Sequence, residues 1–501
     1  MRKIFLLLSL FATSLAGAQK IADPKPFAAG ITEEDLKKHL YTVASKDFEG
    51  RETATEGQRK AAAYIENHFR SLGLLPGNKD SYQLFFPVFQ DSTGEMALTI
   101  NGQSFRPSED FVANPGYNYS ATLFGGEIVF AGYGISDSTR DDYKGLDVKG
   151  KIVLILNGEP ADPSRPQGGA PAHFSPFGKQ EAAQKNGAIA LMVIQSGFPR
   201  KNYGPKGNMY LNGFKNRIFP NTFYISDRVA GAILGEDFDK ATKDGAANPA
   251  PYKADIMIRY EKITLQLHSS DVLGFLEGSD LKDQLVVISA HYDHLGKRDS
   301  VIYYGADDDG SGTVSVLELA TAFAKAKAAG SGPRRSILFL ANSGEEKGLW
   351  GSEYYSDHPV FDLAKTTVDL NIDMVGRIDP NRKHGDSANY VYIVGDDKLS
   401  SDLHPISVEQ NKKYTKLELD YKFNDPKDPE RIYYRSDHYN FARKGVPIIF
   451  YFDGIHHDYH KPTDTPDKIN YDLLAKRDRL IFYTAWEMAN RDEMLKRDRK
   501  L

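Results

Sequence analysis

Apolar runs alternate with helical patterns along the second half of the chain. From about residue 261 onward, continuous apolar segments predict buried strands at residues 285–291, 336–342, 366–373, 390–395 and 446–452. Helices are predicted after Gly312 and, from apolar residues at helical spacing, around residues 474–488. Such alternation is typical of a sheet covered on both faces. We therefore expect an α/β fold with a mostly parallel mixed sheet sandwiched by helices.

The first half of the chain has a different pattern. Two amphipathic helices are predicted, one after a T-x-x-D capping pattern at Thr32 and one that ends at Gly73. From about residue 82 to 260, short β-like runs alternate with Gly, Pro, Asn and Asp, which predicts a small α/β module. Because single cores stop growing near about 250 to 300 residues, a chain of 501 residues divides into domains.

Three regions are predicted to be folded. Residues 19–109 form helices and strands that join the larger domain, residues 110–254 form an insert, and residues 255–501 form the larger α/β domain. Residues 1–18 are different, since two cations and an apolar run are followed by Ala16-Gly17-Ala18. This pattern is typical of a signal peptide that is cut before Gln19, and we expect export to the periplasm or the extracellular space.

Composition and charge narrow the chemistry. The chain has no cysteine, so a metal would have to bind to histidine and carboxylate ligands, and a thiol nucleophile is excluded. The net charge of -5 is spread without a basic stripe, so we expect no nucleic-acid partner. No later segment approaches the roughly 20 apolar residues of a membrane span.

Polar groups follow the predicted strands at the points where the strands end. In a parallel sheet these ends meet at one edge, where ligands gather. Three adjacent aspartates in a glycine-rich turn often coordinate a cation, and paired glutamates repel unless a positive charge lies nearby. The groups in question are His291, Asp293, the run Asp307-Asp308-Asp309, Glu345, Glu346, Asp373, Arg435, Asp437, His438, Tyr459 and His460.

Taken together, these segments resemble peptidase family M28, a family of zinc metallopeptidases, in members with an inserted protease-associated domain. The motifs are H-x-D at 291–293, G-A-D-D-D-G-S-G at 305–312, E-E-x-G-L-x-G-S at 345–352, D-M-V-G at 373–376, S-D-H at 436–438 and Y-H-x-P-x-D-T at 459–465. The resemblance implies the zinc-exopeptidase (phosphorylase/hydrolase-like) fold and covers most of residues 255–490, while residues 110–250 resemble the protease-associated insert. In the family such an insert lies beside the active site, so a role in limiting substrate size is a hypothesis.

The resemblance also implies two Zn²⁺ ions per chain. One ion would be held by His291 and Asp373, and the other by Glu346 and His460. Asp308 would bridge the two ions.

Further roles are carried over in the same way. Glu345 would be the general base and acid, and Asp293 would orient His291. Tyr459 would donate a hydrogen bond near the developing oxyanion, and Arg435 would contact the substrate.

Several neighbouring residues lie outside the family's pattern. We expect His294, His456 and His457 not to bind metal, and Asp307 and Asp309 to shape their loop by hydrogen bonding. Ser436 is not expected to be a nucleophile, because no G-x-S-x-G elbow surrounds it.

Three classes of function remain. The first is an aminopeptidase that acts on a peptide substrate, and the second is a carboxypeptidase or dipeptidase on the same scaffold. A glutaminyl cyclase is less favoured, because the single-zinc site of that enzyme does not require the histidine present at His291. The third is a non-catalytic, receptor-like binding protein, against which the complete ligand set argues. The pattern identifies neither the side-chain preference nor the oligomeric state.

Overall fold

The computed structural model describes residues 22–138, 140–160, 174–200, 203–212, 218–242 and 248–500. The predicted signal peptide and its cleavage site lie outside these residues. The chain forms two compact units, one made of Met1–Phe86 and His268–Leu501 and the other of Pro87–Leu267.

A mixed sheet forms the centre of the first unit. Its four central strands, β18, β15, β11 and β14, are parallel to one another, and antiparallel strands pair with them on both sides. The strand order is β17 (Glu418–Asp420), β16 (Tyr390–Val394), β18 (Ile448–Phe452), β15 (Thr366–Ile372), β11 (Leu281–His291), β14 (Arg335–Asn342) and the last part of β10 (Ala250–Leu276), to which β1 (Leu75–Pro76) adds. All five predicted strands are present.

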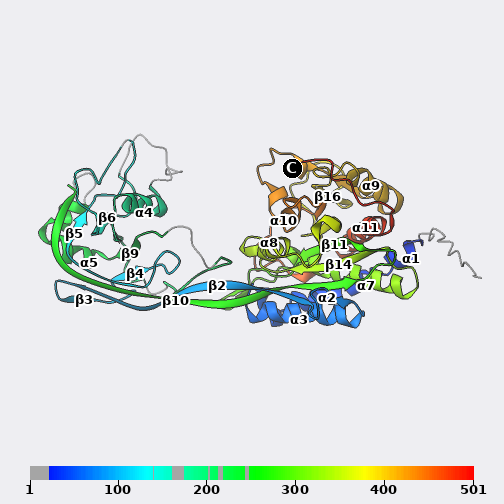
Figure 1. Ribbon diagram of the computed structural model, residues 1–501, viewed down its shortest axis with the longest axis horizontal. Helices are drawn as coiled ribbons and strands as arrows, with labels where there is room; N and C mark the ends of the chain where they lie inside the picture. The colour runs from blue at the N-terminus through cyan, green and yellow to red at the C-terminus, as the bar shows by residue number, and fades with distance from the viewer. Residues whose placement is uncertain are drawn as a thin grey trace, which may run out of the picture. The chain divides into compact units, whose positions relative to one another are not determined.

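Helices cover both faces of this sheet because alternate strand residues point to opposite sides. Val286 and Ile288 of β11 belong to the core under one set of helices, and Leu285 and Val287 to the core under the other set. The first set contains α1 (Lys25–Ala28), α2 (Glu33–Val43), α3 (Glu56–Ser71), α7 (Gly312–Ala328), α9 (Leu403–Gln410) and α11 (Tyr471–Asn490), and the second contains α8 (Trp350–Asp357) and α10 (His438–Ala442). In Figure 1, α2 and α3 lie below the strands, on the side away from α8 and α10. The predicted α/β fold class is confirmed.

The N-terminal helices form as their sequence predicts. The Thr32 hydroxyl accepts a hydrogen bond from the backbone N–H of Asp35 and so caps α2. Leu36, Leu40 and Val43 of this helix are all buried in the core of the first unit.

The second unit contains a smaller sheet. Its strands run in the order β5 (Ala121–Phe130), β6 (Ile152–Leu156), β7 (Ala190–Ile194), β9 (Asn221–Ile225) and β4 (Phe111–Ala113), with the first part of β10 beside β5. Its other elements are β3 (Gln103–Phe105), β8 (Lys206–Tyr210), α4 (Pro176–Lys185), α5 (Asp227–Leu234) and α6 (Phe238–Thr242). The unit extends beyond the predicted limits 110–254, and its assignment as a protease-associated domain stays a prediction.

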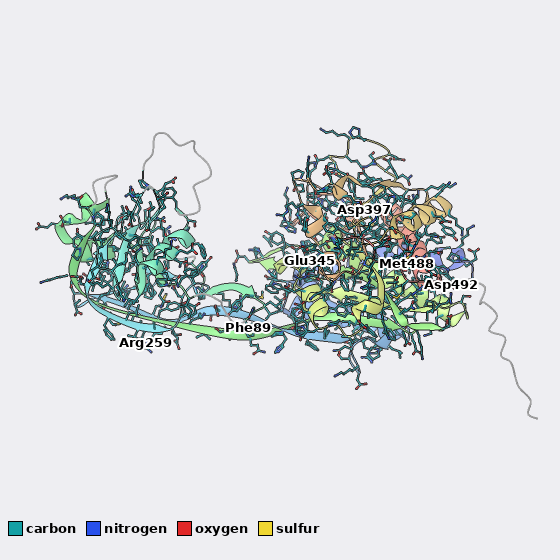
Figure 2. All side chains as sticks on the ribbon, turned by 45° about the horizontal axis from the view of Figure 1, so that its top comes forward. Phe89, Arg259, Glu345, Asp397, Met488 and Asp492 are labelled. Atoms are coloured by element: carbon teal, nitrogen blue, oxygen red, sulfur yellow. The ribbon has the colours of Figure 1, made fainter. Side chains whose placement is uncertain are left out.

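Two long strands differ from the short runs predicted between residues 82 and 260. Strand β2 (Gln83–Ile100) has 18 residues and β10 has 27, and Phe89 and Arg259 lie along them (Figure 2). The sequence did not predict this length, because polar residues such as Glu261 and Lys262 interrupt the apolar pattern. The strand continues through them because hydrogen bonds between backbone groups form whatever the side chains are. The chain passes between the two units inside β2 and β10, where no turn marks a boundary.

No helix among the described residues is long and apolar enough to cross a membrane.

Candidate functional site

The candidate site lies in the first unit, at the carboxyl ends of the four parallel strands. Strand β11 ends at His291, and β15 ends one residue before Asp373. Beyond β14 the chain turns into the short helix η5 (Glu345–Lys347), and His460 follows β18 in a loop. The sheet therefore gathers residues that are up to 169 positions apart, from His291 to His460.

Two groups of donor atoms share Asp308. The Nε2 atom of His291 lies 3.3 Å from Asp308 Oδ1 and 3.6 Å from Asp373 Oδ1. The Nε2 atom of His460 lies 3.0 Å from Asp308 Oδ2 and 3.2 Å from Glu346 Oε2. Two ligands on one tetrahedral zinc ion, each at about 2.0 to 2.2 Å from it, are separated by about 3.3 Å, so both groups fit zinc.

The unpartnered polar atoms and the charges of these residues are also those expected where a cation binds. The Nε2 atom of His291 and the Oδ2 atom of Asp308 are buried and have no hydrogen-bond partner among the described residues. Although burial opposes the charge, Asp308 and Glu346 raise the pKa of His460 to about 10. A metal ion that binds here would take the place of the proton on this imidazole.

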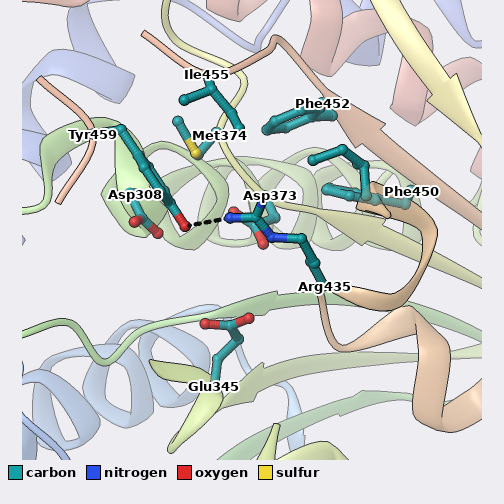
Figure 3. A pocket seen from close by; sticks show the side chains of 10 residues that line it. Asp308, Glu345, Asp373, Met374, Arg435, Phe450, Phe452, Ile455 and Tyr459 are labelled. Carbon is teal, nitrogen blue, oxygen red and sulfur yellow. Dashed lines mark hydrogen bonds between the residues drawn. The ribbon is translucent and has the colours of Figure 1, made fainter. Parts of the chain in front are cut away.

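Glu345 lies beside both groups without belonging to either. Its carboxylate faces Asp308 and Asp373 across a pocket (Figure 3), and its Oε2 atom lies 3.8 Å from His291 Nε2. Burial raises the pKa of Glu345 well above its usual range, and the nearby Glu346 and Asp373 carboxylates add to this effect. A carboxyl group with a raised pKa is suited to exchanging protons near neutral pH.

Asp293 contacts His291 through its main chain and Glu345 through its carboxylate. The His291 Nδ1 atom lies 3.1 Å from the main-chain oxygen of Asp293 and 3.7 Å from its carboxylate. The carboxylate instead accepts hydrogen bonds from the Thr53 hydroxyl at 2.7 Å and from the Glu345 backbone N–H at 3.2 Å. Asp293 thus positions both residues, His291 through its main chain and Glu345 through its side chain.

Asp307 and Asp309 shape their loop, as the sequence predicted. Asp309 accepts hydrogen bonds from the backbone N–H groups of His291, Gly312 and Met374. Asp307 accepts one from the backbone N–H of Gly376. The turn η4 (Ala306–Ser311) is thereby fixed to the ends of β11 and β15 with Asp308 between its two anchors.

Sequence reasoning missed Arg51. This fully buried guanidinium donates to the carbonyls of Tyr292 at 2.7 Å, Tyr304 at 2.7 Å and Gly305 at 2.9 Å. It therefore ties the segment after β11 to the start of the aspartate turn. A single arginine about 240 residues before its partners gives no local signal that could have revealed this role.

The three remaining histidines of the region have different surroundings. His457 is exposed, and His456 lies with its Nε2 atom 3.1 Å from Asp307 Oδ2. His294 does not match its predicted place outside the site, because the structure buries it against Glu346 with 2.7 Å between Nδ1 and Oε1.

The pocket beside Glu345 has a polar side and an apolar side (Figure 3). Arg435 donates a hydrogen bond to the Tyr459 hydroxyl oxygen at 3.2 Å. The apolar side is lined by Met374, Ile432, Phe450, Phe452 and Ile455.

Residues 271–485 match the family described as Peptidase family M28. A probable leucine aminopeptidase of Trichophyton verrucosum is 28% identical over 41% of this chain and 55% of its own length. The aminopeptidase YwaD of Bacillus subtilis is 24% identical over 73% of this chain and 68% of its own length. A glutamate carboxypeptidase 2 homolog of Caenorhabditis elegans is 25% identical over 69% of this chain and 51% of its own length. The chain spans 55 to 60% of the length of the first leucine aminopeptidases that it matches.

Solved structures show the same fold. An aminopeptidase from Aneurinibacillus sp. strain AM-1 superposes with a TM-score of 0.53 at 21% identity, over 95% of this chain and 98% of that one. A zinc aminopeptidase from Bacillus subtilis gives a TM-score of 0.51 at 21% identity, over 92% and 97%. The histidine and carboxylate cluster lies within residues 271–485, so the part of the chain that matches peptidase family M28 contains the candidate metal site.

Proposed function

We propose that this chain is a di-zinc exopeptidase that releases residues from the N-terminus of peptides. The observation that carries the proposal is the position of the Asp308 carboxylate between two histidines. Its Oδ1 atom lies 3.3 Å from His291 Nε2, and its Oδ2 atom lies 3.0 Å from His460 Nε2. Such sharing supports one ion on His291 and Asp373 and a second on Glu346 and His460. The names of the leucine aminopeptidases and of the aminopeptidase YwaD support the N-terminal assignment.

The residues around the pocket have separate roles in the proposed hydrolysis. Bound zinc would polarise the scissile carbonyl and make a nearby water more acidic. Glu345, whose pKa burial raises, accepts a proton from the attacking water and delivers it to the leaving amine. Tyr459 donates a hydrogen bond towards the carbonyl oxygen as negative charge develops on it.

The pocket suits an N-terminal residue. A free α-amino group is a cation, and the carboxylates of Glu345 and Asp373 line the pocket. Met374, Phe450 and Ile455 line the same pocket and would shield an apolar side chain from water.

Arg435 favours a second candidate, a carboxypeptidase or dipeptidase. Its guanidinium lies at the pocket beside Tyr459 and would pair with a substrate carboxylate. A match to a glutamate carboxypeptidase 2 homolog is in line with this alternative.

Peptides blocked at one end distinguish the two candidates. We expect the protein to hydrolyse peptides with an amidated C-terminus and to leave N-acetylated peptides intact. A chelator should abolish the activity, and added zinc should restore it. The reverse preference would establish the second candidate, whereas a protein with no bound zinc and no chelator-sensitive hydrolysis would be a non-catalytic binding protein.

Export remains part of the proposal. The two N-terminal cations, the apolar run and the small residues before Gln19 support it. Mass spectrometry of the protein released by its host should find a mature chain that starts at Gln19.

A further inference from the structure

His294 is buried in the candidate metal centre although the family's pattern has no role for it. Its side chain is fully buried, with Nδ1 2.7 Å from Glu346 Oε1 and 3.9 Å from Asp308 Oδ2. His294, Asp308 and Glu346 each offer a ligand atom, and these atoms lie within 4.8 Å of one another.

The atoms that meet here lack satisfactory partners. Neither ring nitrogen of His294 has a hydrogen-bond partner among the described residues, and the same holds for Glu346 Oε1 and Asp308 Oδ2. The contact of 2.7 Å between His294 and Glu346 is therefore close without being a well-directed hydrogen bond. Buried polar atoms left in this way are costly, and a cation between them would satisfy both the imidazole and the carboxylates.

The backbone holds the His294 ring in this place. A Cβ atom on Gly305 would lie 2.5 Å from the ring carbons Cγ and Cδ2, so only glycine fits against the ring. Gly305 also has a φ of +54°, which favours glycine, and Arg51 binds its carbonyl at 2.9 Å. The backbone N–H of His294 donates to the Arg51 carbonyl at 3.3 Å. The ring is thus fixed from two sides, and its approach to Glu346 follows from the fold.

Glu346 lies between two imidazoles. Its Oε2 atom is 3.2 Å from His460 Nε2, and its Oε1 atom is 2.7 Å from His294 Nδ1. The His294 and His460 rings are 5.9 Å apart between centroids, at an angle of 68°. Two imidazoles and the Glu346 carboxylate therefore converge on one side of Asp308, whereas on the other side the described residues place one imidazole, that of His291.

We propose that His294 binds, through Nδ1, the same divalent ion as Asp308, Glu346 and His460, an inference that rests on the proposed di-zinc function. The two metal positions then differ chemically, with two imidazoles at this one and one imidazole at the His291 position. Because imidazole suits zinc better than carboxylate does, the His294 position binds zinc more tightly and fills first. The His291 position exchanges its ion more readily.

Metal titration of the stripped, full-length protein tests this assignment. With Zn²⁺ followed by equilibrium dialysis and with Co²⁺ followed by its visible absorption, we expect two unequal binding steps in the wild type. In His294→Ala the tighter step should weaken by more than about 100-fold, because loss of an orienting neighbour alone costs about 10- to 100-fold. The exposed His457→Ala variant is the matched control and should bind as the wild type does.

A second variant separates a ligand from a hydrogen-bond donor. His294→Asn keeps an N–H donor near the position of Nδ1 but provides no imidazole. A tight step that survives in His294→Asn would overturn the assignment and leave His294 as a positioning residue for Glu346. A loss equal to that of His294→Ala supports coordination.

A measurement on the wild type covers the case in which both variants fail to fold. The protein is loaded with a spin-active cadmium isotope and labelled at its histidine ring nitrogens. Three rings coupled to cadmium support the assignment, and two rings, from His291 and His460, overturn it. A wild-type protein that binds fewer than two ions would instead remove the proposed di-zinc function on which the inference rests.

Discussion

Glu345 and Glu346 are neighbours in the sequence, but the structure gives them different surroundings. Glu346 lies against His460 and His294, while Glu345 opens onto the pocket and is closer to His291. The sequence pattern identified both carboxylates, and the separation between them comes from the turn η5 after β14.

The variant Glu345→Gln tests this division of roles. The amide cannot accept a proton from water, so turnover should fall by about 10²- to 10⁴-fold. Zinc content, measured by elemental analysis, should remain that of the wild type because Glu345 is not a ligand. Turnover close to that of the wild type would remove Glu345 from the mechanism.

Arg435 and Tyr459 should act as a pair. By donating to the Tyr459 oxygen, Arg435 leaves the phenolic proton free to point at the substrate. We expect Arg435→Ala and Tyr459→Phe each to lower kcat by about tenfold or more. The double variant should lose little more than either single one, since residues that share one hydrogen bond are not additive.

Two further outcomes check this pair. Losses that multiply in the double variant would show that the two side chains act independently. Arg435→Lys, which keeps the charge but changes the geometry, should recover part of the activity.

At the scale of elements, the parallel strands are the feature that the sequence predicted best. Continuous apolar runs identify buried strands, and polar residues just after them must meet at one sheet edge. The long strands β2 and β10 were missed, because their polar residues hide a pairing that only the backbone maintains. Thr53 and Arg51 were missed as well, since their partners are distant in the sequence.

Asp369 makes the pairing of β11 with β15 sensitive to pH. It is fully buried, accepts a hydrogen bond from the Ser289 hydroxyl at 2.7 Å, and lies opposite Val287. Burial raises its pKa to about 8 from the ordinary value of 3.8. At a pH between 3.8 and about 8, the Asp369 carboxyl keeps its proton in the folded protein and has lost it in the unfolded chain. The contribution to stability is therefore complete below pH 3.8 and is lost as the pH rises towards 8.

The variant Asp369→Asn should remove this dependence. The amide has the same shape and does not titrate, so the unfolding free energy should lose a slope of up to about 1.4 kcal/mol per pH unit between pH 4 and 8. Denaturant unfolding at several pH values measures the slope. An unchanged slope would mean that Asp369 is ionised in the folded protein, and Ser289→Ala serves as the control for the lost hydrogen bond alone.

For the whole molecule, metal binding should be linked to the stability of one of the two units. Both candidate clusters found among the described residues lie in the unit that contains residues 268–501. An ion present at 100 times its dissociation constant adds about 2.7 kcal/mol to the stability of the folded state. For a unit of this size, removing one such ion should lower Tm by about 4 °C.

Differential scanning calorimetry with and without a chelator measures this shift. The transition of the unit that contains Pro87–Leu267 should stay in place if the two units unfold separately. A single transition that does not respond to chelator would contradict structural metal binding. Re-addition of zinc is the control for effects of the chelator itself.

The sequence by itself determined two things about this protein: its apolar periodicity predicts the sheet, and the residue types at the strand ends predict a site for a cation. Zinc and proton transfer by Glu345 are what the resemblance of these motifs to peptidase family M28 implies. Tertiary structure alone decided which atoms meet. The fold places the Asp308 carboxylate between His291 and His460. It also brings the Asp293 carboxylate into hydrogen bonds with Thr53 and Glu345, and it places His294 beside Glu346. The reason is that a sequence pattern acts over a few neighbouring residues, whereas these contacts join segments that become neighbours only when the sheet and its loops are folded.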